Sequence, residues 1–274
     1  MVSTFNRCIS ISNLECCEEE ELKSSHEEAD TKFILHAKHV ATHFPSPRVV
    51  LRSHSGDTDI IVLAVALLQE YRDRIMLDDG SGKSRRTVKL NDVDLDEDVI
   101  GALIGFHAFT GNDYCSSFFR KGKETCFKVM QRKSNFSQAF SRVGTEWDLP
   151  DDLFKELEIY VCSLYGSNSK DINKARYLQF KKKFSNEEKA IDMATLAPCK
   201  PVLVLQVKKA NYVACIWKRS GNQHIYEPPF SSHGWDPDGR DVWVEEAYPD
   251  EITEILFEPE YDNDGTYGAE IDMN

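Results

Sequence analysis

The sequence has no long hydrophobic run among its 274 residues. A membrane-spanning helix needs about 20 predominantly apolar residues, so we expect none in this chain. Residues 1–22 lack a basic region followed by an apolar stretch, and we therefore expect no secretory signal there. No internal repeat is evident.

The eight cysteines form no CxxC pair and no regular framework, which argues against a disulfide scaffold. Cys115, Cys126 and Cys162 lie within apolar segments. We expect free, buried thiols in a reducing, intracellular compartment, with the nucleus as one candidate location.

Two short motifs lack the residues that nucleotide-binding loops and hydrolases require. Residues 80–84 read GSGKS, but a phosphate-binding loop of the form GxxxxGK[ST] needs glycine at the position that Leu77 occupies. We expect a hairpin turn there instead. Ser53-His54-Ser55 has no nucleophile-elbow motif around it, so no serine hydrolase is predicted.

Positive charge is scarce overall but is gathered in the middle of the chain, whose formal net charge is −13. Residues 120–219 carry 20 Lys and Arg against 11 Asp and Glu, whereas residues 220–274 carry 1 against 15. Phosphate contacts depend on local rather than net charge. The basic middle is therefore either a nucleic-acid footprint or the solvated surface of ordinary helices.

The first part of the chain alternates helix and strand signals, which predicts an α/β core over residues 25–120 after a disordered or partial segment over 1–24. The expected elements, in chain order, are a helix over 27–44, a strand over 49–51, a helix over 60–68 after an aspartate-bearing loop, a hairpin of strands 74–77 and 87–90, and a buried helix over 99–109.

The later part is predicted to be a basic helical region over 121–219 and an acidic extension over 220–274, with its last part disordered. The expected helices cover 122–142, 150–165, 171–183, 187–195 and 201–218. The extension offers two short strands, around 242–244 and 253–257.

Short acidic clusters stand at the edges of the apolar segments. They are Glu28 and Asp30 at the start of the first helix, Asp57 and Asp59 before the second, and Asp113 after the last helix of the core. Singly, such residues are more often caps or turn formers. Carboxylates buried together repel one another, so a divalent cation that prefers oxygen ligands, Mg²⁺ or Mn²⁺, is the simplest partner for the five if the fold joins them.

The order of these clusters resembles that of the flap-endonuclease branch of the PIN-like nucleases, the structure-specific 5′ nucleases. Those proteins have a Glu-Ala-Glu-type helix start, an Asp-x-Asp loop after a strand, and Gly-x-Asp-Tyr-Cys after an apolar helix. The matching residues here are Glu28-Ala29-Asp30, Asp57-Thr58-Asp59 and Gly111-Asn112-Asp113-Tyr114-Cys115. The resemblance covers roughly residues 25–135.

The resemblance implies a PIN-like three-layer core with a mainly parallel sheet and a two-metal site for phosphodiester hydrolysis. The implied ligands of Mg²⁺ or Mn²⁺ are Glu28, Asp30, Asp57, Asp59 and Asp113. It also implies a helical hairpin after the last aspartate, where basic side chains meet the phosphates of branched or single-stranded DNA rather than RNA. The corresponding residues are Arg120, Lys121, Lys123 and Lys128.

Two acidic ligands of that family have no counterpart in the 27 residues before Glu28, so we expect a domain truncated at its N-terminus. Most of the chain also resembles multicopy, mobile-element-like proteins of invertebrate animals, through ANYVACIWK at 210–218 and Gly234-Trp235. That likeness implies no activity. Two functions therefore stay open: a divalent-metal-dependent nuclease, and a catalytically inactive nucleic-acid-binding or protein-interaction module derived from a mobile element.

Histidines offer one further candidate site. His36, His39 and His43 share a face of the first predicted helix and are spaced to bind zinc. The sequence places no cysteine or carboxylate to complete the ligand set, so a solvated or packed face is favoured. His107, within an apolar helix, is expected to be a hydrogen-bonded core residue.

Overall fold

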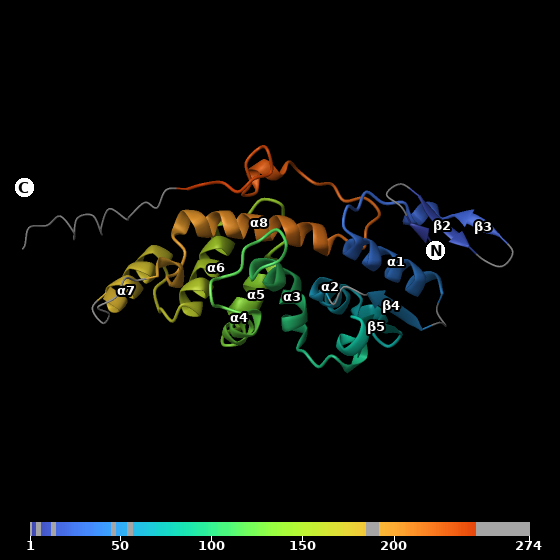
Figure 1. Cartoon of the computed structure of the whole chain (residues 1–274), viewed down its shortest axis with the longest axis horizontal. Helices are drawn as coiled ribbons and strands as arrows, with labels where there is room; N and C mark the ends of the chain where they lie inside the picture. The colour runs from blue at the N-terminus through green and yellow to red at the C-terminus, as the bar shows by residue number, and fades with distance from the viewer. Residues whose placement is uncertain are drawn as a thin grey trace, which may run out of the picture.

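The computed structural model describes residues 2–3, 7–11, 15–44, 48–53, 57–184 and 192–244. It has a mixed α/β core, a mostly helical remainder and a small N-terminal sheet (Figure 1). The main elements are β1 (Val2–Ser3), β2 (Cys8–Ile11), β3 (Cys16–Glu18), η1 (Glu20–Leu22), α1 (Ala29–His43), β4 (Val49–Ser53), α2 (Thr58–Leu67), β5 (Ile75–Asp79), β6 (Arg86–Lys89), α3 (Glu97–Phe109), α4 (Lys123–Met130), α5 (Ser134–Arg142), α6 (Asp151–Leu164), α7 (Ile172–Phe184) and α8 (Lys200–Lys218).

The core sheet has the order β4-β5-β6. Strands β4 and β5 are parallel because α2 forms the crossover between them, as parallel pairing requires. Strand β6 is antiparallel to β5, since residues 80–85 close a tight turn that contains the 3₁₀ helix Gly82–Ser84. The expected hairpin is confirmed, but the expectation of a mainly parallel sheet is wrong: the sheet is small and mixed.

The helical part packs on the core without a break. One continuous hydrophobic cluster includes Leu51 and Ile75 of the sheet as well as Tyr160 of α6 and Trp217 of α8. Helix α3 lies at its centre and approaches α5 closely. Gly105 permits this approach, since a Cβ at that position would stand 2.2 Å from the carbonyl oxygen of Phe140. Helix α8 extends along the top of the helical layer and back toward α1 (Figure 1).

The predicted helix over 122–142 is two helices, α4 and α5. Lys133 adopts an extended backbone between them, which lets Met130 and Phe136 both reach the core. Of the helix predicted over 187–195, residues 187–191 lie outside the described part, and the rest holds only a 3₁₀ turn at Met193–Thr195.

The two ends of the chain differ from expectation where they are described. Residues 1–24, expected to be disordered or partial, contain the antiparallel strands β1, β2 and β3. Beyond α8 the chain returns along that helix, and residues 242–244 form no strand; Trp243 is 98% exposed there. The strand expected over 253–257 and the end of the chain lie outside the described residues.

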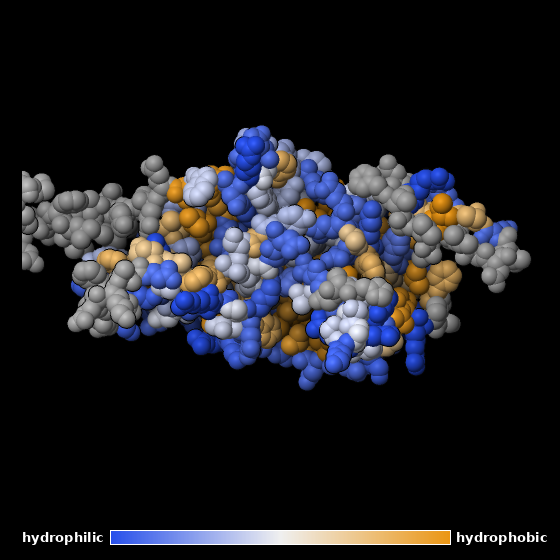
Figure 2. Space-filling view, in the orientation of Figure 1, coloured by the Kyte–Doolittle hydropathy of each residue, from blue (hydrophilic) through white to orange (hydrophobic). Residues whose placement is uncertain are grey.

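Most of the visible surface is hydrophilic (Figure 2), and most of the cysteines are buried. Hydrophilic side chains cover most of the face in Figure 2, with apolar side chains showing in patches between them. Six of the eight free cysteines are buried, and Cys16 and Cys17 on β3 are exposed. Within the part of the chain that the structure describes, no helix is both long and apolar enough to cross a bilayer.

Candidate metal site and adjoining pocket

Three of the five predicted carboxylates meet where α1 and α2 begin. Asp30 lies in the first turn of α1, Asp57 is the N-cap of α2, and Asp59 lies in its first turn. One oxygen atom from each lies within 4.8 Å of the other two. The positive ends of two helix dipoles stabilise negative charge at this point, and the Asp57 side chain accepts a hydrogen bond of 3.0 Å from the backbone N–H of Asp59.

The other two predicted ligands flank this group. Glu28, the N-cap of α1, accepts a 3.1 Å hydrogen bond from the indole N–H of Trp217. Asp113 is exposed beyond the end of α3. Both act electrostatically on Asp30, yet neither belongs to the tight group of three. The structure therefore brings together Asp30, Asp57 and Asp59, with Glu28 and Asp113 at the edge.

The carboxylates leave an excess of negative charge around Asp30. The pKa of Asp30 is raised to about 6, first by burial and then by the nearby charges of Asp57, Asp59, Glu28 and Asp113. A carboxyl whose pKa is raised in this way costs free energy to ionise at neutral pH. A bound cation would remove that cost, so the site is electrostatically suited to one.

Asp59 is held by a chain of hydrogen bonds that reaches α4. The Nε2 atom of His107 lies 2.7 Å from Asp59 Oδ1, and Lys123 Nζ lies 3.0 Å from His107 Nδ1. Since the lysine ammonium can only donate, Nδ1 of His107 accepts and Nε2 carries the proton that it donates to Asp59. Burial acts to raise the pKa of Asp59, but the His107 hydrogen bond, with Lys123 behind it, lowers it below its usual value.

His107 is thus a buried, hydrogen-bonded residue, as expected, although its partner is a site carboxylate. Lys123 behaves differently from the prediction of a phosphate contact, because its amine points inward to His107 and to the carbonyl oxygen of Gly111 at 2.5 Å. Burial lowers the pKa of Lys123. The side chain is long enough to reach the C-terminal end of α3, where its positive charge lies near the carbonyl oxygens of that end.

The remaining predicted phosphate contacts lie on the surface. Arg120 has a left-handed backbone with φ of 55° and places its guanidinium 5.1 Å from the ring centre of Phe119. Lys121 lies over Tyr165, and Lys128 pairs with exposed Glu124. Arg120 and Lys121 line an open groove of about 620 Å³ that continues to Thr110, Gly111 and Asn112.

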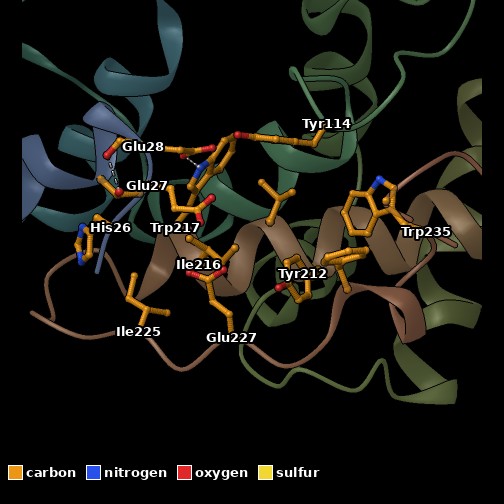
Figure 3. A pocket seen from close by; sticks show the side chains of 14 residues that line it. His26, Glu27, Glu28, Tyr114, Tyr212, Ile216, Trp217, Ile225, Glu227 and Trp235 are labelled. Carbon is orange, nitrogen blue, oxygen red and sulfur yellow. Dashed lines mark hydrogen bonds between the residues drawn. The ribbon is translucent and has the colours of Figure 1, made fainter. Parts of the chain in front are cut away.

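A pocket of about 270 Å³ lies between Glu28 and α8, and of the five predicted ligands only Glu28 lines it (Figure 3). Glu28 and the hydrogen-bonded Trp217 stand at one end, Tyr212 and Trp235 stand at the other, and the Tyr114 side chain extends toward Glu28. Its acidic residues include Glu227, whose pKa is raised by burial and then by the charges of two further glutamates, Glu27 and Glu28. The pocket is therefore aromatic in its walls and acidic at its rim.

The sequence patterns did not predict this pocket. Tyr212, Trp217 and Trp235 belong to the segments that carry the second resemblance, and their aromatic content was the available signal. The wall forms only because the chain after α8 returns along that helix and places Trp235 5.7 Å from the ring centre of Tyr212.

Comparison with known proteins adds no identification. No known protein family, no curated protein sequence and no solved structure matches this chain. Function must therefore be inferred from the residues and their geometry.

Proposed function

We propose that this chain is a nuclease-like protein that binds Mg²⁺ or Mn²⁺ and hydrolyses phosphodiester bonds of nucleic acid, with a core of the PIN-like, flap-endonuclease type. The observation that carries the proposal is the meeting of Asp30, Asp57 and Asp59 at two helix N-termini. The donor set is entirely oxygen and half-buried, as hard divalent cations prefer. The raised pKa of Asp30 supports the same assignment, because burial and the negative charges of the neighbouring carboxylates disfavour its ionised form, and a bound cation would offset them.

Each residue has a role in this proposal. Asp30, Asp57 and Asp59 would hold one cation, and Glu28 and Asp113, whose charges act on Asp30, would contribute to holding a second. A bound divalent ion supplies an activated water and stabilises charge on the phosphoryl oxygens. His107 orients Asp59 and is itself held by Lys123, in the way that outer partners commonly orient metal ligands.

The surroundings favour an unpaired strand as substrate. Arg120 and Lys121 offer positive charge in the groove that continues from Gly111, where phosphates would lie. The aromatic walls of the adjoining pocket suit a stacked base, and its carboxylates suit the amino groups on base edges. Single-stranded or branched DNA is therefore the proposed ligand, and an intracellular location, with the nucleus as a candidate, follows from it.

A second function is favoured by one specific observation. Among the described residues only three carboxylates form the tight group, whereas the resemblance implies five ligands. A protein with this arrangement can bind nucleic acid through the aromatic pocket without cleaving it. The second candidate is therefore a catalytically inactive nucleic-acid-binding or protein-interaction module of mobile-element origin.

The test compares wild-type protein with an Asp57→Asn, Asp59→Asn double variant on flap, hairpin and single-stranded DNA with Mn²⁺. We expect cleavage by the wild type and a loss of at least about 100-fold in the variant, because charge stabilisation in the transition state is removed. Asp73→Asn, at an exposed position outside the cluster, is the matched control. Equal cleavage by all three proteins would refute the proposal; strand binding without cleavage by the wild type would establish the second candidate.

A further inference from the structure

A second cluster of metal-binding side chains lies at the opposite end of α1. Glu21, His39 and His43 each offer one ligand atom, and the three atoms lie within 4.8 Å of one another. Glu21 Oε2 is 3.3 Å from His39 Nδ1 and 3.4 Å from His43 Nε2. The sequence offered no carboxylate to complete a zinc site with the histidines of α1, and the fold supplies one, Glu21 of η1.

The fold fixes this arrangement from two directions. His39 and His43 are four residues apart on α1, so both point to the same face of the helix. Glu21 lies in η1, where the next residue, Leu22, is 1% exposed and packs with Cys8 and with Leu35 of α1. The buried leucine holds η1 against α1 and places the Glu21 carboxylate beside the two rings.

Two of the three distances between ligand atoms fit a tetrahedral zinc ion, and the third, between the two histidine nitrogens, is within 4.8 Å. Zinc binds histidine nitrogen and carboxylate oxygen at about 2.0–2.2 Å, and ligand atoms at the corners of such a tetrahedron are about 3.3 Å apart. The two distances from Glu21 Oε2 to the histidine nitrogens are of this size. No rearrangement of the backbone is needed for the carboxylate and either ring to share an ion.

A second contact orients His43 for metal binding. His43 Nδ1 donates a 2.9 Å hydrogen bond to the backbone carbonyl oxygen of His39, which can only accept. The proton is therefore on Nδ1, and the lone pair of a neutral His43 lies on Nε2, facing the Glu21 carboxylate. A lone pair on Nε2 that faces a carboxylate can be matched by a proton or by a metal ion, and the hydrogen bond from Nδ1 to the carbonyl oxygen is the kind of outer contact that orients a metal-bound histidine.

We propose that Glu21, His39 and His43 form a Zn²⁺ site that joins η1 to the end of α1. Imidazole donors favour zinc over magnesium, which separates this site chemically from the all-oxygen group at the start of α1. Three protein ligands would leave the fourth position of a tetrahedral ion open, and solvent reaches the group because the His43 and Glu21 side chains are 48% and 68% exposed. The proposal does not depend on the proposed nuclease function.

The experiment titrates Zn²⁺ into untagged full-length protein by calorimetry and records the visible absorption of bound Co²⁺. The Asp57→Asn, Asp59→Asn background removes the carboxylate group; wild-type protein saturated with Mg²⁺ serves if that background does not fold. We expect one Zn²⁺ per chain and a tetrahedral Co²⁺ spectrum. His39→Ala and His43→Ala should each weaken binding by more than about 100-fold, since even an outer partner of a ligand is worth 10–100-fold.

His36→Ala is the matched control, because His36 lies on the same helix but outside the cluster. Its affinity for Zn²⁺ should equal that of the parent protein, and Glu21→Gln should retain the fold while losing the tetrahedral spectrum. Zn²⁺ affinity that is unchanged in His43→Ala, or equally weakened in His36→Ala, would overturn the proposal. So would the absence of Zn²⁺ binding by the folded parent protein.

Discussion

The two ends of α1 carry candidate metal ligands of different kinds in different settings. At its start, Asp30 joins Asp57 and Asp59 in a half-buried, all-oxygen group, and burial and like charge raise the pKa of Asp30. At its end, His39 and His43 meet Glu21 on the surface. The helix dipole favours anions at its first turn and positive charge at its last. The two groups therefore differ in donor atoms, burial and position on the helix, and the two metal proposals rest on these differences.

The largest expected effect is a double dissociation of metal affinities. Asp59→Asn should weaken Mn²⁺ binding by at least about 100-fold and leave Zn²⁺ binding within about twofold, because the two groups lie at opposite ends of α1. His43→Ala should do the reverse. Calorimetric titration with each metal checks both halves. If either variant weakened both metals equally, the two ends would not be separate sites.

Lys123→Met tests the hydrogen-bond chain behind the carboxylate end. The substitution leaves His107 Nδ1 and the Gly111 carbonyl oxygen without their donor, so we expect a loss of about 1–3 kcal/mol in the free energy of unfolding. Urea denaturation measures it. Lys128→Met is the control and should leave the midpoint unchanged, since its pair with Glu124 is exposed. Equal effects of the two substitutions would contradict the inward role of Lys123.

Asp30→Asn should stabilise the metal-free protein. The pKa of Asp30 is about 6 when folded and near 3.8 when unfolded, so its ionisation disfavours the folded state as pH rises through 6. At pH 7.5 in a chelator we expect a gain of about 1 kcal/mol, reduced for a half-exposed group, that shrinks toward zero near pH 4. Urea denaturation over this pH range measures it. A gain that grew at acid pH would show that the sign is wrong.

The smallest effect is expected at the surface end. In the absence of metal, His43→Ala should leave the thermal midpoint unchanged, because the ring is half exposed and its contacts are local. With Zn²⁺ present the parent protein should melt at a higher temperature than the variant. A large loss of stability without metal would make these histidines structural rather than metal-binding.

Local pattern predicted much of the core. Helical spacing identified α1 and α3, the aspartate loop was placed at the start of α2, and the turn residues identified the hairpin of β5 and β6. These features depend on neighbours in sequence, so the sequence carries them directly. The wrong prediction of a mainly parallel sheet rested on the family resemblance. The predicted hairpin already implied that one of its strands is antiparallel to the other.

The rest depends on contacts between distant segments. Glu21 joins the histidines only because Leu22 docks against Leu35, and no periodicity encodes that contact. Lys123 points inward because its long side chain reaches the backbone carbonyl oxygen of His107 near the C-terminal end of α3. Its place in a basic segment predicted a residue on the surface. The aromatic pocket likewise needs the chain after α8 to return along that helix.

Trp217 gives the molecule a built-in optical reporter. Its indole is 2% exposed, donates to Glu28 and lies 5.7 Å from the ring centre of His107, whereas Trp147 and Trp235 are partly exposed and Trp243 is fully exposed. Red-edge excitation and quenching by iodide would separate this shielded indole from the others. Events at the junction of α1, α3 and α8 can therefore be followed by fluorescence in the unlabelled chain.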